Sequence, residues 1–506
     1  MMTLIDYFLD RITMYRLVLY YLIALLAYGF LLSIFGVIAY SPGAIFLSTT
    51  LFLVVTWITN KIFAFIFEAP TNVESVYISA LILSLIFTPL QSIHTVIPLA
   101  WVAVWTMASK YIFAIGKKHL FNPVAIAAVI TSFAIGQSAS WWVGSTWMAP
   151  VVILGGMLIV RKIRRAELVL SFFLTALVTI AVFALAKGGN ISATLQSNIL
   201  HSSLFFFAFV MLTEPLTTPP TKRLQMIYGG LVGILFAPQM QIAGIFSTPE
   251  LALIVGNIFS YLVSPKQKLI LFPKEKFAVS SNVIDFAFTS NKKISFHPGQ
   301  YLEWTLSHPK TDARGNRRYF TIASSPTESE LRLGVKFYEK GSSYKRALYA
   351  LNEKTPIVGA QLAGEFTLPK NPHQKLVFIA GGIGITPYRS MIKYLLDTKQ
   401  QRPIVLFYAN KNISEIAYHE IFNQAAKELG IKTVYTLTEK EKVPANWDGR
   451  VGRIDPKMIA EEVPDYKQRL FYLSGPQGMI DATKKVLKNM GISERQIKTD
   501  YFPGLV

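Results

Sequence analysis

The hydrophobic positions of the chain follow two different patterns, one on each side of Pro265. Before Pro265, long apolar segments alternate with short polar connections, as in proteins whose helices cross a bilayer. Several segments are shorter than the ~20 residues of a perpendicular crossing, so we expect some helices to be broken or to lie in thinner bilayer. The pattern predicts a polytopic α-helical membrane domain of about ten helices over 1–265, with segments at 17–40, 43–60, 75–90, 95–115, 121–138, 148–161, 167–186, 199–213, 224–240 and 249–264.

The charges of this half predict its orientation. Residues 1–265 contain thirteen Lys and Arg against seven Asp and Glu. If successive segments cross in opposite directions, twelve of the thirteen basic residues lie on one side and Lys187 alone lies on the other. Basic residues accumulate in cytoplasmic loops. We therefore expect a multi-pass protein of the cell's inner (cytoplasmic) membrane with both termini in the cytoplasm.

After Pro265 the pattern changes to short segments of alternating polarity, which are typical of β-strands. Up to Pro369 they predict an antiparallel β-barrel domain over 266–370, with strands in 277–288, 301–306, 318–323 and 331–337. Beyond Pro369, apolar runs alternate with helical stretches, which predicts an α/β nucleotide-binding domain with a parallel sheet over 371–506. The expected strands are 375–380, 403–408, 432–437 and 469–473, and the expected helices lie near 387–398, 415–429 and 477–489.

Two motifs of the expected barrel carry candidate chemistry. One strand reads Arg318-Tyr319-Phe320-Thr321 and runs on to Ser324. Arginine can hold a diphosphate, an aromatic ring can stack on a flavin, and a threonine hydroxyl can hydrogen-bond a ring nitrogen. The second motif, Lys340-Gly341-Ser342-Ser343, opens a helix whose free amides can bind phosphate. Each motif alone is also explained by an exposed strand or an ordinary helix cap.

Two further motifs follow strands of the expected parallel sheet. Ala380-Gly381-Gly382-Ile383-Gly384 leads from an apolar run into a helix that begins at Thr386-Pro387. A Gly-x-Gly turn is a weak signal alone, but between a buried strand and a helix it is typical of a dinucleotide-binding turn. Ser474-Gly475-Pro476-Gln477-Gly478-Met479 repeats the strand–turn–helix arrangement after the fourth strand. Ligands of open α/β sheets bind at such carboxyl strand ends.

In this order the motifs resemble the ferredoxin–NADP reductase family, over essentially all of 266–506. The resemblance implies FAD, a nicotinamide dinucleotide and hydride transfer between them, with Thr321 and Ser474 at the reacting centre. Family members often have cysteine where Ser474 stands, and Tyr501 or Phe502 is a candidate to cover the flavin. The resemblance places FAD against Arg318, Phe320, Thr321, Ser324, Gly341, Ser342 and Ser343, and the dinucleotide against Gly382, Gly384, Thr386, Gly475, Pro476 and Met479.

Composition narrows the remaining chemistry. The chain has no cysteine, which excludes disulfides and thiolate-held iron–sulfur clusters. The membrane half holds only His94, His119 and His201, each near a segment end, which is too few for two bis-histidine haems. We therefore expect no metal site and a flavin or quinone as the membrane electron carrier. The net charge of +20 is attributed to membrane orientation and to the binding of anionic dinucleotides near an anionic leaflet, not to nucleic acid.

Two stretches of the membrane half supply a second resemblance. His119-Leu120-Phe121-Asn122-Pro123 enters the fifth segment, and Thr213-Glu214-Pro215-Leu216-Thr217 follows the eighth. Taken alone, each stretch is also explained by proline residues that interrupt helices at the cytoplasmic face. Taken in order with ten helices, they resemble the NqrB/RnfD family of membrane flavin subunits over about 1–265. This resemblance implies FMN or riboflavin in the membrane domain.

Thr194 is the candidate for covalent FMN. Ala193-Thr194 match the end of the family's attachment sequence, but Ile191 and Ser192 replace the preceding pair. The alternative is a plain polar loop between the seventh and eighth segments.

The sequence thus predicts a membrane flavoprotein oxidoreductase that passes electrons from cytoplasmic NAD(P)H via FAD to a membrane flavin or quinone. An extracytoplasmic flavoprotein is a candidate final acceptor. Three alternatives stay open: a quinone reductase without transmembrane transfer, an ion-pumping redox subunit in which Glu214 is the first acid to test, and a transporter with a regulatory nucleotide domain. Lys411, a single cation on a surface turn, leaves NADH and NADPH both open, with NADH slightly favoured.

Overall fold

The structure is a computed structural model of the 506-residue chain. It describes residues 5, 8–9, 12–67, 73–115, 118–200, 203–242, 244–264, 269–292, 294–309, 311–312, 315–339 and 341–500. The chain separates into two compact units, Met1–Lys266 and Gln267–Val506.

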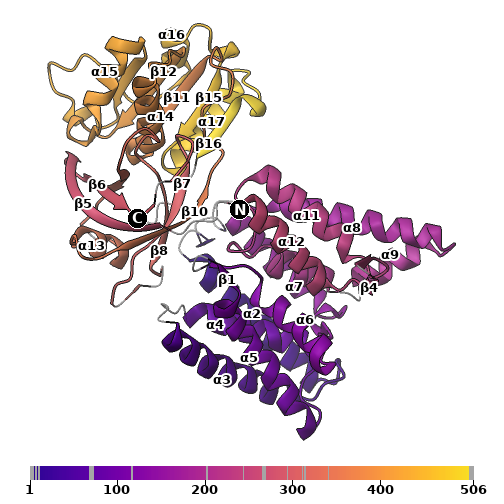
Figure 1. Ribbon diagram of the computed structural model, residues 1–506. Helices are drawn as coiled ribbons and strands as arrows, with labels where there is room; N and C mark the ends of the chain where they lie inside the picture. The colour runs from indigo at the N-terminus through magenta and orange to yellow at the C-terminus, as the bar shows by residue number, and fades with distance from the viewer. Residues whose placement is uncertain are drawn as a thin grey trace. The chain divides into compact units, whose positions relative to one another are not determined.

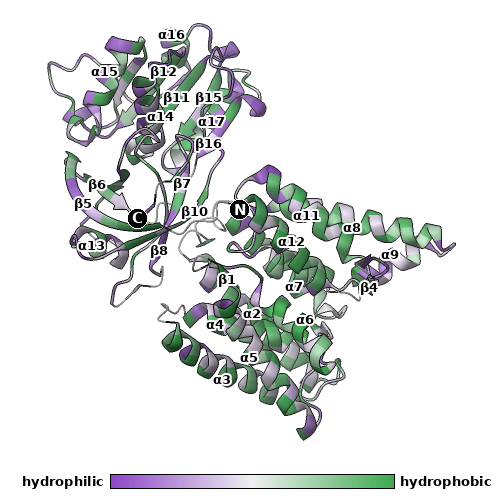
Figure 2. Ribbon diagram, in the orientation of Figure 1, coloured by the Kyte–Doolittle hydropathy of each residue, from purple (hydrophilic) through white to green (hydrophobic). Residues whose placement is uncertain are grey.

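The N-terminal unit is helical, and apolar residues run along its helices (Figures 1 and 2). Short strands pair as two hairpins, β1 (Ala114–Ile115) with β2 (Lys118–His119) and β3 (Gln241–Ile242) with β4 (Ile245–Phe246). The helices are α2 (Met14–Ile34), α3 (Pro42–Ile66), α4 (Val73–Ile86), α5 (Val96–Ile112), α6 (Pro123–Ile135), α7 (Ala149–Ile163), α8 (Ala166–Ala186), α9 (Ile191–Leu200), α10 (Leu204–Phe206), the π-helical turn η3 (Phe207–Met211), α11 (Lys222–Phe236) and α12 (Pro249–Val263).

Each apolar segment of the sequence overlaps helix in this unit. Of the described helices, four are long and apolar enough to cross a membrane: α2, α3, Ile93–Ile112 and α8. The number becomes five if the bent pair of Ile191–Leu200 and Leu204–Met211 counts as one span. The crossing of all ten segments stays a prediction.

Close backbone packing joins α8 and α11. A Cβ atom added at Gly233 of α11 would lie 2.1 Å from Thr175 Oγ1 and 2.6 Å from the carbonyl oxygen of Phe172, both on α8. Small residues that let two helices approach in this way are typical of packing inside membrane proteins.

The first half of the C-terminal unit is a curled sheet of six antiparallel strands (Figure 1). Its core contains Phe286, Trp304 and Leu333, all fully buried. Past the end of edge strand β8, Ala323 N donates to Arg332 O of the opposite edge strand β9 at 2.8 Å. The order is β8 (Arg317–Thr321), β7 (Tyr301–Thr305), β10 (Ile357–Ala363), β5 (Leu269–Ser280), β6 (Val283–Ser290) and β9 (Leu331–Lys336), with α13 (Ser343–Tyr349) after β9.

The second half is a parallel sheet with helices on both faces. The helices α14 (Thr386–Asp397) and α15 (His419–Leu429) pack on one face, and α16 (Pro456–Glu462) and α17 (Gln477–Asn489) on the other. Strand β11 lies between β12 and β15, so the strand order reverses direction beside it. The order is β14 (Arg450–Val451), β13 (Lys432–Leu437), β12 (Ile404–Asn410), β11 (Leu376–Gly381), β15 (Leu470–Ser474) and β16 (Ile497–Asp500).

Candidate functional site

Strand β8 and helix α13 meet at one aromatic residue, Tyr344. The guanidinium carbon of Arg318 lies 5.0 Å from the centre of the Tyr344 ring, and the Phe320 ring centre lies 6.1 Å from it. Arg318 and Phe320 stand two residues apart, so they share one face of the strand. Thr321 ends the strand and is buried. Arg318 and Phe320, two of the residues expected to hold a flavin, are therefore neighbours around Tyr344.

The start of α13 is occupied by a carboxylate. Ser343 N donates to Asp312 Oδ2 at 2.8 Å, and Asp312 N donates to Ser343 Oγ at 2.9 Å. The other carboxylate oxygen, Oδ1, lies 3.9 Å from Arg318 Nη2. An anion at this position lies near both a helix start and a guanidinium, two groups that favour phosphate binding. Gly341 and the cap residue Ser342 are half-buried beside it, whereas Lys340 lies outside the described residues.

The two glycine-containing turns of the parallel sheet lie against each other. Gly382 begins the turn after β11 with φ +52°. A Cβ atom at Gly384 would lie 2.4 Å from Ser474 O and 2.6 Å from Gly475 N, which belong to the turn after β15. Both turns stand where the strand order reverses, which is the position at which open α/β sheets bind dinucleotides.

The other expected dinucleotide contacts surround the same edge. Thr386 is the first residue of α14, is buried, and donates from Oγ1 to Ile383 O at 3.2 Å. Ser474 is buried at the end of β15, Pro476 caps α17, and Met479 lies in its first turn against Gly381. Tyr501 and Phe502 lie outside the described residues.

Charged side chains connect the curled sheet to α14, and no local sequence pattern predicts this connection. Arg389 of α14 is 2% exposed and donates from Nη2 to Glu328 Oε1 at 2.9 Å and from Nη1 to Ala323 O at 3.0 Å. Nearby, Asp285 of β6 lies fully buried with Oδ2 3.0 Å from Arg332 Nε. Burial raises the pKa of Asp285, while Arg332 and Arg389 act in the opposite direction. Only the fold brings these residues together, because they are distant in sequence.

Thr194 lies in the other unit, and its surroundings correct one expectation. The sequence suggests a polar loop here, but Thr194 belongs to helix α9. Asn190 starts that helix: its Oδ1 accepts from Ala193 N at 3.1 Å, and its carbonyl oxygen accepts from Thr194 N at 3.0 Å. The Thr194 hydroxyl donates to the same carbonyl oxygen at 2.9 Å.

The two motif stretches of the N-terminal unit converge on Glu214. Asn122 Nδ2 donates to Glu214 Oε2 at 2.8 Å, and His119 Nε2 lies 3.4 Å from Oε1. Asn257 Oδ1 of α12 accepts from Asn122 N at 2.8 Å, and its Nδ2 lies 3.2 Å from Tyr228 Oη. This set, which we call the Glu214 network, is a polar cluster within an apolar unit. Among the residues that the structure describes, no group of three or more His, Asp or Glu is placed to hold a metal ion.

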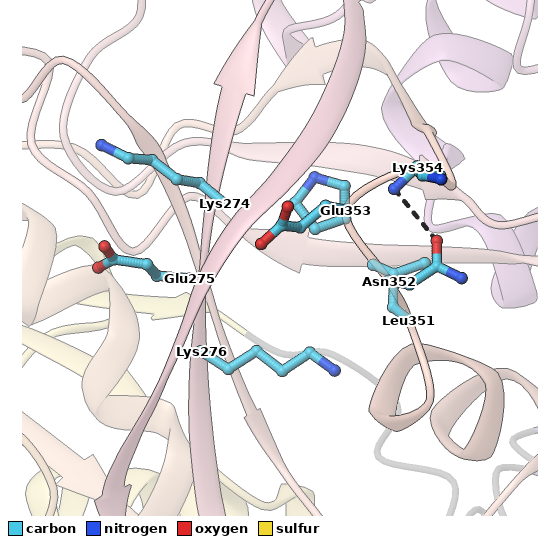
Figure 3. Close-up of a pocket in the computed structure, with 8 residues that line it drawn as sticks. Lys274, Glu275, Lys276, Leu351, Asn352, Glu353 and Lys354 are labelled. Carbon is cyan, nitrogen blue, oxygen red and sulfur yellow. Dashed lines mark hydrogen bonds between the residues drawn. The ribbon is translucent and has the colours of Figure 1, made fainter.

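A hollow of about 660 Å³ on the curled sheet is separate from these sites (Figure 3). It contains none of the expected contact residues. Lys274 pairs with Glu330 at 2.5 Å, and Lys276 Nζ donates to Tyr349 O at 2.8 Å, so these cations already have partners. Its lining residues are Pro273, Lys274, Glu275, Lys276, Leu351, Asn352, Glu353 and Lys354.

Comparison with known families assigns a segment of each half. Residues 378–485 match the oxidoreductase NAD-binding domain. Residues 142–268 match the NQR2, RnfD, RnfE family. The chain joins a membrane-family segment to an oxidoreductase domain. Both resemblances drawn from the sequence are thereby confirmed, each in its own half.

Known proteins similar to this chain include a flavohemoprotein, a phenol hydroxylase protein and an FAD/NAD binding domain. A flavohemoprotein of Burkholderia sp. is 29% identical over 41% of this chain and 52% of its own length. The phenol hydroxylase P5 protein of Acinetobacter pittii is 28% identical over 49% of this chain and 68% of its own length. The flavohem-like FAD/NAD binding domain of nitric oxide dioxygenase from Vibrio cholerae has 20% identity and a TM-score of 0.41, covering 46% of this chain and 97% of that domain. The chain spans about half the length of the flavohemoprotein that it matches.

Proposed function

We propose that the chain is a membrane flavoprotein oxidoreductase that oxidises cytoplasmic NAD(P)H through a bound FAD and passes the electrons to a flavin or quinone in its membrane domain. The observation that carries this proposal is the pair of glycine-containing turns at the strand reversal, in the same unit as the Arg318–Tyr344 corner. The NQR2, RnfD, RnfE match in the same chain supports an acceptor within the membrane.

The residues of the curled sheet fit a bound FAD. Arg318 and the amides of Gly341, Ser342 and Ser343 would hold the diphosphate, where Asp312 now marks the position of an anion. Phe320, Thr321 and Ser324 would hold the ring system. FAD supplies hydride acceptance at its ring, and the protein supplies orientation and exclusion of water. Asp312 must give up its contact with Ser343 N for the diphosphate to take that amide.

The turns of the parallel sheet would hold the dinucleotide. Gly382 and Gly384 would let the backbone approach its phosphates at the start of α14, and Gly475, Pro476 and Met479 would line the nicotinamide side. Thr321 and Ser474 would flank the reacting atoms. NADH is the preferred dinucleotide in this proposal, because Lys411 Nζ lies 4.0 Å from the carboxylate of Glu439, which would repel a 2′-phosphate.

The proposal includes a direction of electron transfer, from the cytoplasmic side of the membrane to the outer side. Both termini and the C-terminal unit face the cytoplasm, in accordance with the positive-inside distribution, and all ten apolar segments cross. FMN or riboflavin in the membrane domain is the proposed carrier, with attachment at Thr194 as one form. An extracytoplasmic flavoprotein is then the final acceptor.

Inside-out vesicles test this function. Vesicles that contain the chain should oxidise added NADH, and the purified chain should release FAD on denaturation. Reduction of a quinone analogue without any outer-face acceptor would favour the quinone reductase alternative. Dinucleotide binding without oxidation would favour a transporter with a regulatory domain and would contradict the enzyme.

The Glu214 network favours one second candidate, an ion-coupled redox subunit. A half-buried carboxylate in contact with asparagine and histidine is a group that can bind or release a cation inside a membrane protein. Turnover of the wild-type chain should then depend on sodium or on a proton gradient, and Glu214→Gln should abolish that dependence. Glu167→Gln, which removes a half-exposed carboxylate 2.6 Å from Lys222, is the matched control.

A further inference from the structure

Helix α14 has two roles in one stretch of sequence. Its first residue, Thr386, completes the dinucleotide turn, and Arg389 and Ser390 follow within one helical turn. Arg389 is 2% exposed and Ser390 is fully buried, although both carry polar groups. Their hydrogen-bond partners all lie in the segment that joins β8 to β9 of the curled sheet.

Two of these partners are backbone carbonyl groups just after β8, the strand that carries Arg318 and Phe320. Arg389 Nη1 donates to Ala323 O at 3.0 Å, and Ser390 Oγ donates to Ser324 O at 2.6 Å. Ala323 follows Thr321, the last residue of β8, after a single intervening residue. The turn expected to bind the dinucleotide is therefore connected to β8 by a short path. The path consists of the first turn of α14, two hydrogen bonds, and the two residues of chain that lead from Thr321 to the hydrogen-bonded Ala323 carbonyl.

The turn that receives α14 is itself fixed. Glu328 Oε2 accepts from Ser325 N at 2.6 Å, and the same carboxylate forms a two-pronged pair with the Arg389 guanidinium. Ser324 Oγ accepts from Arg332 N at 3.0 Å, which ties the segment to β9. A bidentate arginine–carboxylate pair fixes orientation as well as distance.

A close contact at Gly334 of β9 leaves no room for a side chain between the curled sheet and α14. A Cβ atom at Gly334 would lie 2.4 Å from Tyr418 Oη and 2.9 Å from Thr386 Cγ2. Glycine is thus needed for α14 to approach the curled sheet this closely.

We propose that Arg389 and Ser390 are positioning residues that set the separation between nicotinamide and flavin. This inference rests on the proposed function. Hydride transfer requires the reacting atoms to approach within about 3–3.5 Å, and a misplacement of about 1 Å can cost 10²-fold in rate. Arg389 and Ser390 hold that separation without themselves contacting either cofactor.

Single-turnover reduction of FAD in the purified full-length chain tests the inference. Three variants are compared. Arg389→Lys keeps the charge but loses the two-pronged pair with Glu328, and Ser390→Ala removes the hydrogen bond to Ser324 O. Gly334→Ala inserts a methyl group between the curled sheet and α14. Asp465→Asn is the matched control, because it removes ion pairs with Lys375 and Arg469 inside the nucleotide-binding lobe only. FAD content and the Kd for the dinucleotide are measured on each.

At saturating NADH we expect FAD in the Arg389→Lys and Gly334→Ala variants to be reduced about 10- to 100-fold more slowly than in the wild type. The rate for Ser390→Ala should lie between that of the wild type and those of the other two variants. FAD content and the dinucleotide Kd should change less than about threefold, and a deuterium isotope effect from labelled NADH should show that the hydride step is the one slowed. Unchanged reduction rates in folded, FAD-loaded variants would overturn the inference, as would a loss of rate that only follows a loss of FAD. A wild-type chain that binds FAD but is not reduced by NADH would overturn the proposed function together with the inference.

Discussion

At the scale of single residues, the candidate site depends on groups that already surround an anion, the Asp312 carboxylate. Arg318 faces Tyr344 on one side and the Asp312 carboxylate on the other, while its neighbour Arg317 points to the opposite face of β8 and lies 3.6 Å from Glu303. The alternation of a strand thus separates two adjacent arginines into one expected cofactor contact and one structural ion pair.

The first prediction compares these two arginines. Arg318→Met should weaken FAD binding about 10- to 100-fold, since hydrogen bonds to a charged group are worth about 1.5–3 kcal/mol. Titration of the FAD-free chain with FAD measures the Kd. Arg317→Met removes the same charge from the same strand and should leave that Kd within about threefold of wild type. Equal weakening by both substitutions would contradict the assigned role of Arg318.

The site could be predicted from the sequence where its signal is local. The turn after β11 and the strand with Arg318 were both recognisable, because a buried strand, a glycine turn and a helix start lie within a few consecutive residues. Asp312 and Arg389 were not recognisable, since Arg389 meets Glu328 at a separation of 61 residues and only the topology brings them together.

At the scale of elements, the strands that the sequence predicts are again those with a local signal, an apolar run. Strands β11, β12, β13 and β15 coincide with apolar runs of the sequence, whereas β10 and the edge strands β14 and β16 were missed. Edge strands are short and half-exposed, so their sequences lack an apolar run. Helix α9 differs from the predicted polar loop because polar and apolar residues are equally frequent in it and its start depends on the Asn190 cap.

The packing of α11 on α8 gives a prediction at this scale. Gly233→Ala should lower the thermal unfolding midpoint of the detergent-solubilised chain by several degrees, because the added methyl group meets the backbone of α8 at 2.6 Å. Gly230→Ala, three residues earlier on the same helix, would lie 3.5 Å from its nearest neighbour, Ser171 Oγ, and should leave the midpoint nearly unchanged. The opposite order of the two midpoints would contradict this helix contact.

At the scale of the whole molecule, the chain combines an oxidoreductase NAD-binding domain with a segment of the NQR2, RnfD, RnfE family. In the proposed function, the first would be the site of hydride transfer, and the second would hold the electron acceptor within the membrane. The absence of cysteine from the sequence excludes thiolate-bound iron–sulfur clusters as electron carriers between them.

The central claim is that NADH reduces FAD in this chain and that the electrons continue to an organic acceptor. Anaerobic titration of the purified full-length chain with NADH, followed by flavin absorbance, tests it most directly. We expect NADH to bleach the flavin and an organic electron acceptor, added afterwards, to restore its absorbance. A chain that carries no FAD, or whose FAD keeps its oxidised spectrum in excess NADH and NADPH, would contradict the account.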